Sequence, residues 1–372
     1  MDQRERPLDT TRSAHMPSEP GTPAVYAAVD IGTVSTRLIV ARANIAAGED
    51  GDGAGNGPAW TVLDREAQIT DLGEGVDATG RLSEAAVGRT LTTVDGYLAI
   101  VERAAREAGG SALVAATTTS AARDAANAEA LLGPLVERGL SPQVISGDTE
   151  ARLALLGVTS DFVGRGIVVA DIGGGSTELI AGSQPARGPL AVEDDESFNV
   201  GCRRVTERFF PEGGPVSPDA QARARAFAAE TLAPFFARMR RRGGNLPELV
   251  CVGGTATSLV SVANALVPYD PAFVHLHRMG RDEVHAQALR LAGLTPDELR
   301  GLPGLQPKRA RVIAAGALIL DALLEAGGWD GFSASESDSL IGLLRCIDAE
   351  ARGEDSPIGW SPMARALFAA RG

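Results

Sequence analysis

The sequence predicts an α/β protein made of two similar domains, each with a mixed sheet flanked by helices. Two related segments carry this prediction. Asp30-Ile-Gly-Thr-Val-Ser-Thr-Arg37 follows an apolar strand pattern at residues 24–29, and Asp171-Ile-Gly-Gly-Gly-Ser-Thr-Glu178 follows another at residues 167–170. Each half of the chain begins with strand patterns and ends with helical ones, an order that is typical of α/β folds. The repeat therefore indicates a duplicated domain.

Composition limits the classes of function. The 372 residues suffice for two domains with cores of their own, and 44% hydrophobic content is ordinary for a globular protein. The net charge of −13 argues against binding to nucleic acid or to an anionic membrane surface. Three widely spaced cysteines fit free thiols in a reducing cytoplasm. No apolar run approaches the roughly 20 residues that a membrane helix needs.

The first half is expected to contain strands at residues 24–29, 38–43 and 60–63, with a Gly- and Asp-rich hairpin insertion at 46–58. Residues 69–75 are expected to form a further edge strand and turn. Ser83 is placed to cap a long helix that ends at the glycine pair 109–110. A strand at 112–116, a helix at 127–137, a strand at 142–145 and a helix capped by Asp148 follow.

The second half is expected to repeat this plan, with strands at 167–170, 179–180, 197–200, 249–252 and 332–334. Its main helices are expected at 203–210, 218–242, 281–292, 307–326 and 338–349, and the acidic run 193–196 as an exposed loop. We therefore expect a disordered tail at residues 1–22, one domain at 23–157 and a second at 158–335. The last helix, 336–350, is expected to pack back on the first domain.

The two glycine segments predict a phosphate site between the domains. Glycine permits a tight turn whose amide groups point at an oxyanion, and the ends of such strands face the cleft. One loop of this kind would fit a simple hairpin turn, but two at equivalent positions favour phosphate. The expected donors are the amides and hydroxyls of Gly32, Thr33, Ser35, Gly173, Gly174, Gly175 and Ser176.

Asp30 and Asp171 end the two strands that precede these loops. Carboxylates suit Mg²⁺, which keeps much of its hydration shell in proteins. Aspartate also commonly caps turns at strand ends. The equivalence of the two positions favours the interpretation as Mg²⁺ ligands, direct or through water.

Seven segments together resemble a known family. The two Asp-Ile-Gly loops and Gly253-Gly-Thr-Ala-Thr257 resemble the phosphate loops and later glycine turn of the actin, heat-shock chaperone and sugar-kinase superfamily. Four others narrow the resemblance to the Ppx/GppA phosphatase family, over residues 24–345: Thr119-Ser-Ala-Ala-Arg-Asp-Ala-Ala-Asn127, Ile145-Ser-Gly-Asp-Thr-Glu-Ala-Arg152, Gly201-Cys-Arg-Arg-Val-Thr-Glu207 and Pro307-Lys-Arg-Ala-Arg-Val-Ile313. The resemblance implies an actin-like (ribonuclease H-like) fold in its short, two-domain form, an active-site cleft between the domains, and a homodimer.

The resemblance also implies roles for single residues. Glu150 matches the family's catalytic glutamate, and its place in a first helical turn favours the ionised form, so that it could take a proton from water. The residues alone favour a surface glutamate that complements the helix dipole, and the resemblance to the family reverses that preference. Glu178 is a second carboxylate candidate for metal or water. Arg123 and Asn127 are expected to hold phosphoryl oxygens, whereas Arg37 fits either a phosphate contact or a solvated face.

Three positions depart from the family pattern. Val34 stands where many members have Asn, Arg311 where Asp is usual, and Ser339-Leu-Ile-Gly342 where Leu-Arg-Glu-Gly is usual. The first lies in a phosphate loop. The other two are expected to affect packing or domain contacts.

Together these features predict an Mg²⁺-dependent exopolyphosphatase that releases orthophosphate from the end of inorganic polyphosphate. The shared motifs leave open hydrolysis of the 5′-terminal phosphate of guanosine pentaphosphate (pppGpp). A sugar or acid kinase of the superfamily would need an adenosine pocket around residues 253–255, and the Glu150 motif disfavours it. A non-catalytic nucleotide or alarmone sensor that keeps the fold is the third class.

Overall fold

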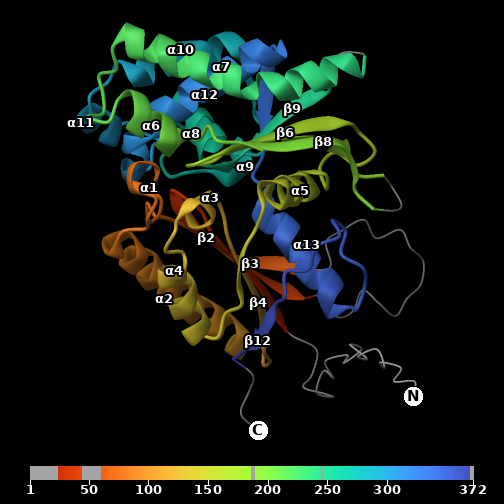
Figure 1. Cartoon of the computed structure of the whole chain (residues 1–372). Coiled ribbons are helices and arrows are strands. Elements are labelled where there is room, and N and C mark those ends of the chain that lie inside the picture. The colour runs from red at the N-terminus through yellow and green to blue at the C-terminus, as the bar shows by residue number, and fades with distance from the viewer. Residues whose placement is uncertain (1–23, 44–59, 186–188, 244–245, 369–372) are drawn as a thin grey trace, which may run out of the picture.

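The computed structural model describes residues 24–43, 60–185, 189–243 and 246–368. The predicted tail at 1–22 and the predicted hairpin insertion at 46–58 lie outside the described residues. The described chain forms two six-stranded mixed sheets with helices packed on them (Figure 1). This confirms the predicted α/β fold with two similar halves. Within the described residues, no helix is both long and apolar enough to cross a membrane.

The first sheet has the strand order β12-β4-β1-β2-β3, and β5 pairs with β4 as well. Its strands are β1 (Val25–Ile31), β2 (Ser35–Ala43), β3 (Trp60–Ile69), β4 (Ala112–Thr118), β5 (Pro142–Val144) and β12 (Arg365–Leu367). The central strand β1 runs antiparallel to β2 and parallel to β4. Strand β12 adds to the edge of the sheet by pairing antiparallel with β4, which the sequence did not predict because three residues carry no readable alternation.

The second sheet has the order β10-β11-β9-β6-β7-β8. Its strands are β6 (Ile167–Ile172), β7 (Thr177–Ser183), β8 (Ala191–Phe198), β9 (Glu248–Val252), β10 (Arg278–Gly280) and β11 (Gly331–Ala334). The central strand β6 is antiparallel to β7 and parallel to β9. This is the same arrangement as around β1, so the sequence repeat corresponds to a repeated sheet topology.

Helices cover both faces of each sheet (Figure 1). Those of the first half and the end of the chain are α1 (Val76–Thr79), α2 (Glu84–Glu107), α3 (Ser120–Asp124), α4 (Glu129–Glu137), α5 (Gly147–Val158) and α13 (Ser339–Ala351). Those of the second half are α6 (Cys202–Phe209), α7 (Pro218–Arg241), α8 (Gly253–Ala263), α9 (Pro271–Val274), α10 (Arg281–Ala292), α11 (Pro296–Arg300), the 3₁₀ helix Pro307–Arg311 and α12 (Ile313–Gly327). The single helix expected at 307–326 is thus a 3₁₀ turn followed by α12.

Alternating side chains on β1 fill two different cores. Val25, Ala27 and Val29 pack in a core with α2, whereas Tyr26 and Ala28 pack in a core with α5 and α13. Every residue of β1 is buried, which is the pattern of a central strand covered on both faces. The last helix therefore lies against the first sheet, although it follows the second sheet in sequence.

Helix α5 lies between the two sheets and is buried on two sides. Leu153 and Leu156 join the core with β1 and α13, whereas Leu155 and Val158 pack against β6 and β7 of the second sheet. Ser146 caps this helix, because its Oγ accepts a hydrogen bond from the amide of Thr149 at 3.2 Å. The cap predicted at Asp148 was therefore two residues late, and Asp148 lies in the first turn.

Two further predictions for local structure were wrong. Residues 70–75 are not an edge strand: β3 ends at Ile69, and the segment turns back against the first glycine loop. The acidic run 193–196 is not a loop but part of β8, where Asp194 is buried and ion-paired with Arg238 at 3.0 Å. In both cases a contact with a distant part of the chain determines the local structure. Such a contact cannot be predicted from the pattern of neighbouring residues.

Candidate active site

The two glycine loops are equivalent tight turns. The amide of Gly32 donates to the Ser35 carbonyl at 2.9 Å, and the amide of Gly173 donates to the Ser176 carbonyl at 3.0 Å. The first turn joins β1 to β2, and the second joins β6 to β7. Residues of both turns line one cavity of about 60 Å³ between the sheets, which is room for a few water molecules. The exception is Gly175, which lines a smaller pocket beside it.

Neighbouring segments hold the carbonyl groups of both turns. The Thr33 carbonyl accepts from the Gly73 amide at 2.9 Å, and the Val34 carbonyl accepts from the amide of Thr70 at 3.0 Å. In the second turn, the Gly174 carbonyl accepts from the amide of Arg203 at 2.8 Å, at the start of α6. The segment at 70–73 and the beginning of α6 thus fix the orientation of the two turns.

The amide groups of the turns remain available. In the described part of the chain, the amides of Thr33, Val34, Gly174 and Gly175 have no acceptor. A buried amide without an acceptor costs free energy, so such groups are usually satisfied by a ligand or water. The turns therefore have amide groups available as donors, and their predicted contact with an oxyanion stays a prediction.

The two turns also contact each other. A Cβ atom added to Gly174 would lie 2.6 Å from Val34 Cγ2, so only glycine fits against the opposite loop. Val34 is 5% exposed and belongs to the core of the second half. Its departure from the family pattern thus replaces a polar side chain with an apolar contact between the loops.

Three carboxylates line the cavity, Asp30, Glu150 and Asp171, and Glu178 lies next to them. Glu178 Oε1 accepts a hydrogen bond from Ser197 at 2.7 Å. Within the described residues, the buried Oε2 atoms of Glu150 and Glu178 have no hydrogen-bond partner. Buried carboxylate oxygens of this kind normally have a donor or a cation as partner.

The electrostatic environment raises the pKa values of these acids. Burial, followed by repulsion from Glu178, Asp30 and Asp171, raises the pKa of Glu150 well above its usual range. Burial likewise raises the pKa of Asp171 to about 6 and that of Glu178 to about 7. The raised pKa of Glu150 opposes the ionised form, which the helix dipole alone would favour.

The donor set fits a hydrated divalent cation. Asp30, Glu150 and Asp171 line one cavity, and Oε2 of Glu150 and of the neighbouring Glu178 accept no hydrogen bond among the described residues, so a cation would offset the repulsion between these acids. No group of three or more Asp, Glu, His or Cys side chains within the described ranges is arranged to hold a metal ion by itself. Mg²⁺ commonly keeps several of its waters and uses one or two carboxylates, so it suits such a site.

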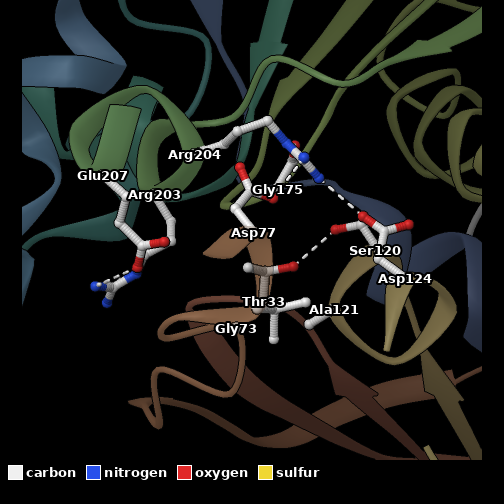
Figure 2. Close-up of a pocket in the computed structure, with 11 residues that line it drawn as sticks. Thr33, Gly73, Asp77, Ser120, Ala121, Asp124, Gly175, Arg203, Arg204 and Glu207 are labelled. Atoms are coloured by element: carbon white, nitrogen blue, oxygen red, sulfur yellow. Dashed lines mark hydrogen bonds and ion pairs between the residues drawn. The ribbon is translucent and has the colours of Figure 1, made fainter. Parts of the chain in front are cut away.

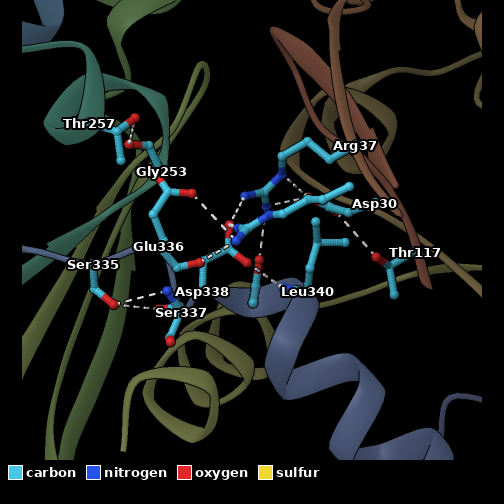
Figure 3. Close-up of polar contacts among 12 residues, drawn as sticks. Asp30, Arg37, Thr117, Gly253, Thr257, Ser335, Glu336, Ser337, Asp338 and Leu340 are labelled. Atoms are coloured by element: carbon cyan, nitrogen blue, oxygen red, sulfur yellow. Dashed lines mark hydrogen bonds and ion pairs between the residues drawn. The ribbon is translucent and has the colours of Figure 1, made fainter. Parts of the chain in front are cut away.

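Arg37 points into this site and not to solvent (Figure 3). Its Nη2 donates to Asp30 Oδ2 at 2.5 Å, and its side chain is 16% exposed. Thr117 Oγ1 donates to the other oxygen of Asp30 at 3.2 Å. The alternative that Arg37 lies on a solvated face is therefore wrong.

Arg309 was not predicted as a site residue, although it belongs to one of the segments that resemble the family. It lines the cavity and lies against Gly254, where any side chain would overlap the guanidinium. Among the described residues the Arg309 guanidinium has no hydrogen-bond or ion-pair partner. Burial lowers its pKa, but an arginine remains protonated in proteins, so the cavity contains an unpaired cation suited to phosphate.

Some predicted residues do not reach the cavity. Both polar atoms of the Asn127 amide pair with the main chain of Leu82, at 2.8 and 3.0 Å, so the predicted phosphate contact of Asn127 is not supported. Arg123 donates to the Ile145 carbonyl at 2.9 Å, and its Nη1 lies 4.0 Å from Glu150 Oε2. Arg123 therefore neighbours the glutamate and does not line the cavity.

A second, smaller pocket lies beside the turns (Figure 2). Arg204 of α6 crosses it from the second half to the first, with ion pairs to Asp77 at 2.5 Å and to Asp124 at 2.8 Å. Its Nε donates to the carbonyl of Gly175 at 2.8 Å. The same side chain thus links the second glycine turn to the first half of the chain.

Two other arginines make similar contacts between the halves. Arg203 pairs with Asp71, and Arg311 pairs with Glu74 at 2.9 Å. Arg311 is the residue that departs from the family pattern, and its partner lies in the other half of the chain. Because both side chains of that pair are largely exposed, we expect its contribution to stability to be small.

Replacement of Arg204 by Met is expected to lower kcat/KM by about tenfold or more, because it removes charged hydrogen bonds worth about 1.5–3 kcal/mol each and releases the Gly175 turn. Small-angle scattering should show a larger radius of gyration than for wild type. Arg223→Met, which removes an exposed pair within α7, is the matched control and should change neither quantity. An Arg204 variant with wild-type kinetics would contradict a role in holding the halves together.

The raised pKa values also predict how stability depends on pH. Asp171 and Glu178 have ordinary pKa values of 3.8 and 4.5, so the folded protein holds protons that the unfolded chain releases. Without metal, the free energy of unfolding should therefore fall as pH rises from about 4 to about 7, with a slope of up to about 1.4 kcal/mol per pH unit for each of the two groups. Denaturant unfolding in a chelator measures this, and Glu178→Gln should reduce the slope. A stability that rises over this range would contradict the assignment.

Comparison with known proteins shows the family of this chain. The model of the Ppx/GppA phosphatase family matches residues 50–327. Exopolyphosphatase 2 of Mycobacterium tuberculosis is 32% identical over 85% of this chain and 96% of its own length. The crystal structure of the Aquifex aeolicus Ppx/GppA family member is 26% identical, covers 88% of this chain and 98% of that chain, and has a TM-score of 0.67. An exopolyphosphatase from Cytophaga hutchinsonii shares the fold, with a TM-score of 0.74 at 20% identity over 90% of this chain and 100% of that one. The chain belongs to the Ppx/GppA phosphatase family.

Proposed function

We propose that this protein is an Mg²⁺-dependent exopolyphosphatase that hydrolyses the terminal phosphoanhydride bond of inorganic polyphosphate. One observation carries the proposal: Glu150, whose buried Oε2 accepts no hydrogen bond among the described residues, lies in a cavity that both phosphate turns line. The M. tuberculosis relative named exopolyphosphatase 2 supports polyphosphate as the substrate.

The residues divide the chemistry among them. The free amides of the two turns and the unpaired guanidinium of Arg309 would bind the terminal phosphoryl oxygens, where negative charge gathers during phosphoryl transfer. Glu150 would orient the attacking water and take its proton. Glu178, which accepts a hydrogen bond from Ser197, would be a second carboxylate for the metal or for water.

Asp30 and Asp171 would hold Mg²⁺, in part through water. When bound, Mg²⁺ supplies positive charge that offsets the phosphoryl oxygens and the buried carboxylates. The same charge would lower the pKa of Glu150, which burial and then repulsion from Glu178, Asp30 and Asp171 raise. A lower pKa favours the ionised carboxylate, which is the form that can act as a base.

Phosphate release from several substrates tests this proposal. With Mg²⁺ present, we expect release from short and long polyphosphate, and much less from ATP. Faster release from guanosine pentaphosphate than from polyphosphate would assign the protein to the pppGpp-hydrolysing activity. Phosphate transfer to a sugar would indicate a kinase, and the absence of any turnover would indicate a sensor. A homodimer and a cytoplasmic location stay predictions.

A further inference from the structure

We propose that Asp338 is a positioning residue for the cation site. Asp338 and Ser339 form a second pairing site for the Arg37 guanidinium, so that Asp30 can bind a divalent cation. The inference rests on the proposed Mg²⁺ dependence. It adds to the cation site a residue that lies far from Asp30 in the sequence. Asp338 lies in the segment that leads from β11 into α13 (Figure 3).

One of the two oxygens of Asp30 is blocked to a cation while Arg37 is in its present position. Oδ2 of Asp30 accepts from Arg37 Nε at 3.1 Å and from Nη2 at 2.5 Å. Among the described residues, Oδ1 accepts only from the neutral hydroxyl of Thr117 at 3.2 Å. An oxygen that already accepts from two charged donors competes poorly as a metal ligand, so Oδ2 can act as one only when Arg37 withdraws from it.

The Arg37 guanidinium already contacts this second pairing site while it is bound to Asp30. Arg37 Nη1 donates to Asp338 Oδ2 at 2.6 Å, and Nη2 donates to Ser339 Oγ at 2.8 Å. The Asp338 side chain is only 5% exposed. A buried guanidinium that left Asp30 without another partner would be an unpaired buried charge, which is costly. Asp338 removes that cost, because it keeps the charge paired.

Asp338 is itself held firmly. Arg65 of β3 donates to its Oδ2 at 3.0 Å, and the amide of Leu340 donates to its Oδ1 at 3.0 Å, which caps α13. Arg65 also donates to the Glu336 carbonyl at 2.6 Å. The second pairing site therefore has a fixed position relative to β3 and α13, and only Arg37 needs to move.

Calorimetric titration of the full chain with MgCl₂, without substrate, tests the inference. Asp338→Asn should weaken Mg²⁺ binding about tenfold or more, as is usual when an outer partner of a metal ligand is lost. Asn keeps the size of Asp and is an equally good helix cap, so α13 should remain intact. Ser339→Ala, which removes no charge, should weaken binding in the same direction by less.

A double-mutant cycle separates positioning from a direct effect. In an Arg37→Gln background, Asp338→Asn should cause no further loss of Mg²⁺ affinity, because there is no guanidinium to hold. A loss that persists in that background would overturn the inference. So would wild-type affinity in Asp338→Asn, and the proposed function would then stand. If the wild-type protein binds no Mg²⁺, the metal assignment itself fails, and this inference fails with it.

Discussion

Replacement of Glu150 by Gln is expected to lower kcat for phosphate release by about 10²–10⁴-fold, the usual contribution of a positioned general base. KM should change little, because the proposed role of Glu150 is to activate water, whereas the proposed phosphate donors lie on the turns. The variant should also be more stable than wild type at pH about 8 without metal, because Gln removes a buried acid whose raised pKa makes ionisation costly. Steady-state kinetics and denaturant unfolding measure the two effects.

Asp148→Asn is the matched control for this change. Asp148 lies in the same first turn of α5, but its side chain is exposed, so the variant should retain the wild-type kcat. A Glu150→Gln protein with wild-type kcat would show that Glu150 is not the base. Glu178, whose Oε2 also lacks a partner among the described residues, would then be the remaining candidate.

The fold could be predicted because its signals are local and repeated. The apolar runs before Asp30 and Asp171 correspond to β1 and β6, and the cap at Ser83 is present, with its side chain accepting from the Ala86 amide at 3.2 Å. The strand β12 and the true cap of α5 were missed. A three-residue edge strand has too few residues for a pattern, and Ser146 and Asp148 are both good caps by type.

Only those parts of the site that lie within short contiguous motifs could be predicted from the sequence. The turn residues line one cavity, and Glu150 joins them because α5 lies between the sheets. Arg309 and Asp338 were not selected, since their distance in sequence from Asp30 hides their closeness in space. Asn127 was selected in error, because nothing in its own segment reveals that Leu82 takes both of its polar atoms.

The helix that carries Glu150 is held by an unusually close crossing. At Gly342 of α13, a Cβ atom would overlap the carbonyl oxygen of Leu153 in α5, and at Gly157 of α5 it would overlap the carbonyl oxygen of Asp338. Each helix thus has a glycine where the backbone of the other passes. Neither contact can be relieved by a side-chain rotation, because both partners are backbone atoms.

Gly342→Ala is therefore expected to destabilise the protein by about 1–3 kcal/mol, the usual cost of overpacking, although alanine is intrinsically the better helix former. Gly96→Ala in α2 is the matched control, since no atom lies within 4 Å of the added Cβ, and it should stabilise by up to about 1 kcal/mol. If denaturant unfolding shows that the two variants change the free energy of unfolding in opposite directions, then the helix crossing, and not helix propensity, determines the effect at Gly342. Because α13 would push α5 away, Gly342→Ala should also lower kcat. Equal stabilities for the two variants would contradict the close approach of these helices.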